Sequence, residues 1–377
     1  MKTVGVYIHV PFCRAKCGYC DFYSFRGTEE EKGQYLEAVM AHLRRSLPGR
    51  PVGSIYIGGG TPSLLGEAAL CRILDTVTTT AEVLPHAEIT VETNPAAEGA
   101  DLSALAAAGV NRISLGVQSA HARELRALGR RHTNDDILRT VQAITDAGID
   151  NYNLDLMYGI PYQTESTWDQ SIDFVLSLSP AHVSAYALKL EEGTPLYHAV
   201  SAGNLSLPEE DLTADLYEQL VRRLAGAGIF QYEISNFARP GKESRHNLNY
   251  WHCGEYLAFG PAAAGYVDST RYTYCRDLSR YIDACRAGRP DDAACEIEVL
   301  DDGAKEQEFV MLSLRLSAGV SLSEYRKRFG ADFNEVYGKA CKPYFSSGHM
   351  IRREDAVAFS TKGFLVSNYI LSDILKF

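Results

Sequence analysis

Six short runs of β-forming residues alternate with helix-like segments over the first half of the chain, and this alternation constrains the fold more than any other feature. A chain that repeats strand and then helix forms a parallel sheet with helices packed on it. We therefore predict an α/β fold whose sheet is either doubly wound or curled towards a barrel. The predicted strands are Val4–Val10, Ser54–Gly58, Glu88–Thr93, Arg112–Val117, Asn151–Met157 and His182–Leu188, and the predicted helices between them are Glu30–Ser46, Leu64–Thr79, Asp101–Ala108, Asn134–Ala147 and Thr167–Leu176.

The alternation ends near residue 200, and the rest of the chain predicts two further parts. Asn236–Gly265 is rich in Gly, Asn, Tyr and His and predicts a loop, whereas Gly288–Asp302 is polar and acidic and predicts a linker. From Lys305 onwards, helices followed by short strands and a final amphipathic helix follow the outline of a winged helix. The expected parts are an α/β core at 1–235, a loop and linker segment at 236–300, and a small C-terminal helical domain at 301–377.

The charge balance excludes a general nucleic-acid binder. Lys and Arg number 37 against 48 Asp and Glu, a net charge of −11, whereas phosphate binding needs a basic surface. Residues 301–377 hold 11 basic and 10 acidic side chains, so this domain is expected to pack or dock rather than to read DNA. The first apolar run is too short for a signal peptide, and no apolar run is long enough to span a membrane. We therefore expect a cytoplasmic protein without a transmembrane segment.

Three of the nine cysteines, Cys13, Cys17 and Cys20, form a C-x3-C-x2-C cluster just past the first predicted strand. The carboxyl ends of parallel strands are where ligands bind in α/β folds. Three thiolates suit a cubane iron–sulfur cluster that keeps one iron without a protein ligand, whereas an electron carrier would need four. The alternatives are a zinc site completed by His9 or a distant Cys, and accidental clustering. The spacing favours the iron–sulfur cluster, because zinc sites usually carry paired C-x2-C motifs.

Glycines and polar residues follow the later predicted strands. Gly58-Gly59-Gly60-Thr61-Pro62-Ser63 comes after the second strand and lets the backbone approach a ligand closely, although a tight turn explains such a run equally well. Each polar residue would be costly to bury alone, so each is expected to have a partner, either in the protein or in a ligand. The polar residues at or beyond the strand ends are Glu92, Gln118, Arg130 and Asp155.

The run Tyr7-Ile8-His9-Val10-Pro11-Phe12-Cys13, followed by Cys17-Gly18-Tyr19-Cys20, resembles the radical S-adenosylmethionine (SAM) superfamily. It is most similar to the branch that holds oxygen-independent coproporphyrinogen III oxidases and their relatives. The resemblance implies a partial (β/α)6 barrel of TIM type and a [4Fe–4S] cluster on Cys13, Cys17 and Cys20, with SAM on the fourth iron. It assigns SAM binding to Tyr7, Gly59, Gly60, Thr61, Glu92, Gln118, Arg130 and Asp155.

Two positions separate the members of this branch. Phe22 stands where the oxidases carry a further Cys, and His246-Asn247-Leu248-Asn249-Tyr250-Trp251 is similar to the heme-binding motif of the HemW heme chaperones. The resemblance thus implies heme at His246. From the residues alone, a lone His in an aromatic loop is more often structural, and His252 and Cys253 are alternative ligands. One departure is Tyr162, where relatives commonly have Gly.

The resemblance implies a heme chaperone that binds a [4Fe–4S] cluster, SAM and heme. Such a protein would deliver heme to acceptor hemoproteins, including membrane respiratory enzymes, and would form a homodimer. The alternative is an oxygen-independent coproporphyrinogen III dehydrogenase, in which a radical cleaved from SAM removes hydrogen from two propionate side chains. A third reading is a radical SAM enzyme that acts on an unrelated substrate.

Overall fold

The computed structural model describes residues 2–95 and 102–375, and six parallel strands form its centre. These strands pair in chain order, and a helix follows each of them, as the alternation predicts. Asp101, expected to begin a helix, lies outside the described residues. The strands are β1 (Val4–Val10), β2 (Pro51–Gly59), β3 (Glu82–Thr93), β4 (Arg112–Gln118), β5 (Tyr152–Tyr158) and β6 (His182–Ala187).

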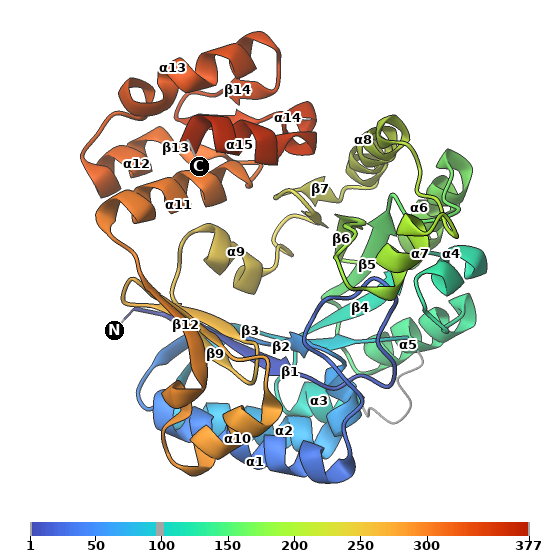
Figure 1. Ribbon diagram of the computed structural model, residues 1–377, viewed down its shortest axis with the longest axis vertical. Helices are drawn as coiled ribbons and strands as arrows, with labels where there is room; N and C mark the ends of the chain where they lie inside the picture. Colours follow the sequence, from blue (N-terminus) through green and yellow to red (C-terminus); the bar gives the residue numbers. More distant parts are fainter. Residues whose placement is uncertain (1, 96–101, 376–377) are drawn as a thin grey trace.

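The six strands do not close on each other. The outer edge of β1 pairs with β9 (Tyr256–Phe259), and the outer edge of β6 pairs with β8 (Asn236–Ala238). The other edge of β8 pairs with β7 (Phe230–Gln231), the last strand of the sheet on this side. The sheet is therefore a partial (β/α)6 barrel, which confirms the expected fold class (Figure 1). The helices after these strands are α1 (Glu29–Ser46), α2 (Glu67–Thr80), α3 (Leu102–Ala107), α4 (Ala122–Ala127), α5 (Asn134–Asp146), α6 (Glu165–Ser177), α7 (Pro195–Ser201) and α8 (Glu210–Gly226).

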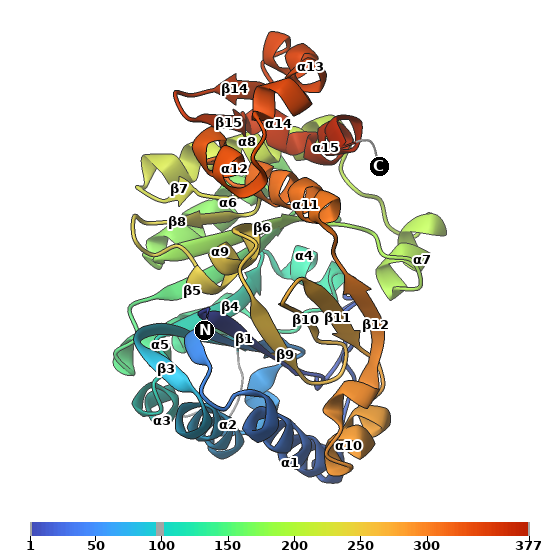
Figure 2. The same ribbon diagram turned by 90° about the vertical axis from the view of Figure 1, so that its left-hand side faces the viewer.

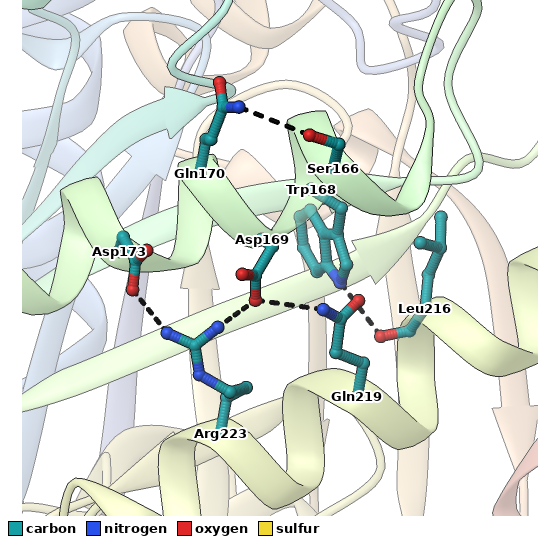
Figure 3. A network of polar contacts seen from close by, with 8 residues as sticks. All are labelled: Ser166, Trp168, Asp169, Gln170, Asp173, Leu216, Gln219 and Arg223. Atoms are coloured by element: carbon teal, nitrogen blue, oxygen red, sulfur yellow. Dashed lines mark hydrogen bonds and ion pairs between the residues drawn. The ribbon is translucent and has the colours of Figure 1, made fainter.

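The contact between α6 and α8 shows how these helices are fixed to each other (Figure 3). Trp168 is fully buried, and its indole N–H donates a hydrogen bond to the Leu216 carbonyl at 2.9 Å. On the outer side of the same contact, Arg223 forms ion pairs with Asp169 and Asp173. An apolar contact inside and ion pairs at the rim set the register of the two helices.

The segment Asn236–Gly265 is not a loop, and that prediction was wrong. It contains β8, α9 (Arg245–Trp251), β9 and the start of β10 (Ala264–Val267). These elements are three to seven residues long, too short to show a period in the sequence, and they form because tertiary partners hold them. Helix α9 lies on the face of the sheet opposite α1, α2 and α3 (Figure 1).

The predicted linker Gly288–Asp302 is also wrong, because it contributes a strand to the main sheet. It holds a 3₁₀ turn (Pro290–Ala293) and β12 (Ala294–Val299), which pairs with β11 (Thr270–Tyr274). Helix α10 (Leu278–Arg286), which lies between β11 and β12 in the sequence, packs against α1. Strand β12 is at the edge of the sheet and largely exposed, so its sequence is polar like that of a linker. Figure 2 shows β9 to β12 as an extension of the sheet beyond β1.

The C-terminal part has the expected winged-helix order of helix, strand, two helices and two strands. Its three strands form a separate antiparallel sheet in the order β13-β15-β14. Two backbone hydrogen bonds fix it to the core, from Ile234 to Arg315 at 3.0 Å and from Ser317 to Tyr232 at 2.9 Å. Its elements are α11 (Asp302–Leu314), β13 (Val320–Ser321), α12 (Leu322–Phe329), α13 (Phe333–Ser346), β14 (Met350–Arg352), β15 (Ala356–Phe359), α14 (Thr361–Leu365) and α15 (Ser367–Leu375). Across residues 2–95 and 102–375, no helix has the length and apolar character to cross a bilayer.

Candidate cofactor site

The three clustered cysteines lie on one loop between β1 and α1, at the carboxyl end of the parallel strands. The loop closes on itself at its base, where Cys13 N–H donates to Phe25 O and Phe25 N–H donates to Pro11 O, both at 2.9 Å. Its tip is tied to other barrel units by hydrogen bonds from Gly18 to Leu128 at 3.0 Å and from Leu196 to Gly18 at 2.8 Å. The loop is therefore fixed by the barrel.

The surroundings of the three thiols bear on which metal group they could hold. Burial raises the pKa of Cys17 and of Cys20, and the Cys13 thiol is 3.7 Å from the Thr61 hydroxyl. In the described part of the chain, no three His, Cys, Asp or Glu side chains converge as ligands of one ion. His9, the suggested fourth zinc ligand, has both ring nitrogens hydrogen-bonded, to the Tyr7 hydroxyl and to the Tyr23 carbonyl. A cubane attaches each thiolate to a different iron, so its ligands need not converge on one point.

The glycine run after β2 lies directly against the start of the cysteine loop. The Gly60 and Thr61 N–H groups donate to Val10 O and Phe12 O, each at 2.7 Å. A Cβ at Gly60 would lie 2.5 Å from Phe12 O, and Gly59 has a φ of +105°. These glycines are thus required for a close approach of two backbone segments, which places Thr61 beside the cluster loop.

Arg130 joins the cysteine loop to the ends of β3 and β4. Its guanidinium donates to Asn94 Oδ1 at 2.5 Å and to the Tyr19 hydroxyl at 2.9 Å, and its buried Nε has no partner among the described residues. A Cβ at Gly116 would lie 3.1 Å from both Asn94 Oδ1 and Gln118 Nε2. The side chains of Asn94 and Gln118 therefore both lie next to Gly116. Asn94 and Tyr19 were not predicted as site residues, although both lie inside the motifs that drew attention to their neighbours.

Two half-buried carboxylates line the same edge. Glu92 accepts a hydrogen bond from the Tyr56 hydroxyl at 2.7 Å and one from Gly59 N–H at 3.0 Å. Burial raises the pKa of Glu92 to about 7, and it raises the pKa of Asp155, which accepts from Asn153 at 2.6 Å. Carboxylates held in this way would favour a ligand with ammonium or hydroxyl donors. The glycine cradle, both carboxylates and the unpartnered Arg130 nitrogen together fit an amino-acid nucleoside such as SAM.

His246 lies inside the partial barrel on α9, and its side chain is 1% exposed. Its Nδ1 is hydrogen-bonded to the Ser54 hydroxyl at 2.8 Å and its Nε2 to the Tyr250 hydroxyl at 2.6 Å. The ring stacks on Tyr56 with 5.2 Å between centroids, and burial lowers the pKa of His246 to about 3. The imidazole is therefore neutral, but neither nitrogen is free in this conformation. Of the alternative ligands, His252 is exposed and Cys253 is half-buried.

Strand β3 also holds the start of α9. The Glu88 carboxylate accepts from the Ser244 hydroxyl at 3.1 Å and from the backbone N–H groups of Arg245 and His246 at 3.0 and 3.1 Å. These donors are among those that a helix N-terminus leaves unsatisfied. One strand therefore carries both the carboxylate that anchors α9 and Glu92.

The structure also places Phe22 and Tyr162, the two positions discussed in the sequence analysis. Phe22 is 66% exposed on the cysteine loop. Tyr162 has a φ of +70°, the left-handed region that favours glycine, so the expectation of Gly at this position has a backbone reason. Its ring lies 3.8 Å from the Arg123 guanidinium carbon, a cation–π contact that offsets part of the strain.

Comparison with known proteins agrees with this arrangement. The profile of the radical SAM superfamily matches residues 7–175, and that of the HemN C-terminal domain matches residues 305–366. The heme chaperone HemW of Bacillus subtilis is 34% identical, with 98% of this chain and 99% of that protein covered. The heme chaperone HemW of Mycobacterium tuberculosis is 35% identical, with 99% and 95% covered.

A mitochondrial radical S-adenosyl methionine domain-containing protein 1 from Bos taurus is 40% identical over 70% of this chain and 61% of that protein. Among solved structures, coproporphyrinogen III oxidase (HemN) from Escherichia coli has a TM-score of 0.86 at 21% identity. The match covers 99% of this chain and 90% of that chain, and it shows a shared fold.

Proposed function

Because this chain belongs to the HemW family of radical SAM proteins, we propose that it is a heme chaperone, which binds heme and passes it to acceptor hemoproteins. One observation carries the proposal: the chain is 34% identical, from end to end, to a protein named as a heme chaperone. The similarity covers the C-terminal domain as well as the partial barrel. A shared barrel alone would not distinguish a chaperone from an enzyme.

The proposed cofactors are a [4Fe–4S] cluster and SAM. Cys13, Cys17 and Cys20 would hold the cluster, which supplies an electron and an open iron when bound. Glu92 and Asp155 would accept hydrogen bonds from SAM. The remaining proposed SAM contacts are Tyr7, Gly59, Gly60, Thr61, Gln118 and Arg130.

We assign the heme ligand to His246. Its neutral ring needs no deprotonation before it ligates iron, and Tyr250 and Trp251 on the same helix are aromatic neighbours for a porphyrin. Ligation requires His246 to exchange its hydrogen bond to Ser54 or to Tyr250 for an iron bond.

Hemin titration tests this assignment. Wild type is expected to show a Soret band that His246→Ala loses, with at least a tenfold weaker affinity. His42→Ala is the matched control, because His42 is also buried with both ring nitrogens near tyrosine hydroxyls, Tyr281 at 2.9 Å and Tyr274 at 3.3 Å. His42→Ala should lose stability and keep the Soret band. The same spectrum and affinity for wild type and His246→Ala would refute His246 as the ligand.

Anaerobic reconstitution tests the cluster. Replacement of Cys13, Cys17 or Cys20 by Ala should abolish the [4Fe–4S] absorbance, whereas Cys295→Ala, which removes an exposed thiol on the edge strand, should retain it. Absorbance that survives the loss of all three clustered thiols would refute the cofactor assignment.

Turnover on the same reconstituted sample separates the chaperone from the coproporphyrinogen III dehydrogenase. The chaperone should form no protoporphyrinogen from coproporphyrinogen with SAM and a reductant, and turnover would overturn our proposal. The structural similarity to the oxidase, at 21% identity, is evidence that the two proteins share a fold, but it is not evidence that they share an activity.

The proposal includes a cytoplasmic location, acceptor hemoproteins such as membrane respiratory enzymes, and a homodimer. Cell fractionation, heme transfer to an apo-hemoprotein and light scattering test these three points separately.

A further inference from the structure

We propose that Asn94, held by Arg130, orients the Thr61 hydroxyl so that it donates a hydrogen bond to the Cys13 sulfur, and that this bond raises the reduction potential of the cluster. The inference rests on the proposed cofactors, because it takes Cys13 to ligate a [4Fe–4S] cluster. It gives a role to Asn94, to which the sequence assigns none. In this role Asn94 is a positioning residue, because it acts through Thr61.

A line of hydrogen bonds runs from Arg130 to the first cysteine of the loop. The Arg130 guanidinium donates to Asn94 Oδ1 at 2.5 Å, and Asn94 Nδ2 donates to the Thr61 hydroxyl oxygen at 2.9 Å. The Thr61 oxygen lies 3.7 Å from Cys13 Sγ, within hydrogen-bond range for sulfur. The line joins three units of the barrel, since Thr61 follows β2, Asn94 follows β3 and Arg130 follows α4.

The direction of each bond follows from what each group can donate or accept. A guanidinium has only donors, so the Asn94 atom that faces Arg130 is the carbonyl oxygen. The amide nitrogen of Asn94 then faces Thr61, and it too can only donate. The Thr61 oxygen accepts this bond, which leaves its own proton for Cys13. A cysteine that ligates iron is a thiolate and can only accept, so Thr61 is the donor of the last bond.

The surrounding structure holds this line of bonds in place. Thr61 is 8% exposed, and its N–H donates to Phe12 O at 2.7 Å, which fixes its backbone beside the cysteine loop. The second arm of the Arg130 guanidinium donates to the Tyr19 hydroxyl on the same loop at 2.9 Å. Because Arg130 is held at two points, a rotated Asn94 amide would place two donors face to face.

A hydrogen bond to a ligating sulfur favours the reduced cluster. Reduction adds negative charge to the cluster and its thiolates, and a donor at the sulfur stabilises that charge. Cys13 is half-buried, so water screens the effect only in part. We therefore expect the cluster to be harder to reduce when the Thr61 proton no longer points to Cys13.

The test measures the midpoint potential of the cluster in the reconstituted full-length chain, without SAM, from the electron paramagnetic resonance signal of the reduced cluster during a redox titration. Thr61→Val removes the hydroxyl at nearly constant size. It should shift the equilibrium about tenfold towards the oxidised cluster, which is about 59 mV for one electron. Thr61→Ser keeps the donor and should keep the wild-type potential. Thr90→Val is the matched control, because it removes another buried threonine hydroxyl, on β3, and should leave the potential unchanged.

Asn94→Asp tests whether Asn94 acts through Thr61. A carboxylate still accepts from Arg130, but it also accepts from Thr61 and would turn the hydroxyl proton away from Cys13. Its added negative charge lowers the potential as well, so the substitution is measured both in wild type and in Thr61→Val. The charge acts in both backgrounds, whereas loss of the bond to Cys13 acts only in wild type. The change in the reduction equilibrium should therefore be about tenfold larger in wild type than in Thr61→Val.

The outcomes distinguish this inference from the proposed cofactors. An unchanged potential in Thr61→Val, or a shift of the same size in Thr61→Ser or Thr90→Val, would overturn the inference and leave the cofactors standing. Equal shifts from Asn94→Asp in both backgrounds would also overturn it. Loss of the cluster in Thr61→Val or Asn94→Asp would overturn it as well, because that residue would then do more than set the potential. If the wild-type chain holds no [4Fe–4S] cluster, both the inference and the cofactor proposal fail.

Discussion

Glu92 allows a quantitative prediction, because its carboxyl is half-buried and its pKa is far from that of a free side chain. Burial raises this pKa from 4.5 to about 7 despite the hydrogen bonds from Tyr56 and Gly59. Between these two values the folded chain keeps a proton that the unfolded chain has released. In this pH range the unfolded state binds fewer protons than the folded state, so the free energy of unfolding falls as the pH rises. The contribution of the Glu92 proton to folding stability is complete below pH 4.5 and is lost as the pH rises through 7.

The magnitude follows from the same two values. A difference of one pKa unit corresponds to about 1.4 kcal/mol, so Glu92 should lower the free energy of unfolding by about 3 kcal/mol between pH 4.5 and pH 8. Glu92→Gln has no proton to lose at this position. Its amide can still donate to the Tyr56 hydroxyl and accept from Gly59 N–H, so the local contacts persist.

Urea denaturation of the chain without cofactors, at pH 5, 6, 7 and 8, measures this effect. The free energy of unfolding should fall more steeply with pH in wild type than in Glu92→Gln, and the two curves should diverge by about 2.5 kcal/mol between pH 5 and pH 8. Glu37→Gln, at a side chain that is 63% exposed, controls for the loss of one negative charge. Parallel curves for wild type and Glu92→Gln would refute the raised pKa of this carboxylate.

Three further substitutions test the fold and the glycine cradle. Trp168→Phe loses the hydrogen bond to Leu216 O between α6 and α8 and should lower the free energy of unfolding by about 1–2 kcal/mol in urea denaturation. Thr28→Ala removes the capping box of α1 and should cost about 1 kcal/mol, measured as a lower urea midpoint at constant slope. Gly60→Ala places a Cβ 2.5 Å from Phe12 O and should weaken SAM binding by about tenfold or more in calorimetry; unchanged affinity would show that the loop tolerates displacement.

The sequence by itself determined the α/β core, the position of the cysteine loop and the outline of the C-terminal domain. Strand and helix periods are local properties, and long periodic segments such as α1 and α5 have few alternatives. The cysteines and glycines could be placed at one sheet edge because the carboxyl ends of parallel strands meet there. Asn94 and Tyr19 were missed, since nothing in their local sequence shows that Arg130 bonds to both.

Only the tertiary structure decided what the segment after residue 235 does. Helix α9 is seven residues long and β9 is four, so neither could be recognised by period, and each depends on partners distant in sequence. Glu88 anchors α9 from 158 residues away along the chain, where it accepts from His246 N–H. For His246 the family resemblance implies heme ligation, which stays a prediction, whereas the residues alone favour a structural histidine. That its imidazole is buried, with both nitrogens engaged and Tyr56 between it and Glu92, follows from packing across the sheet, which no local pattern encodes.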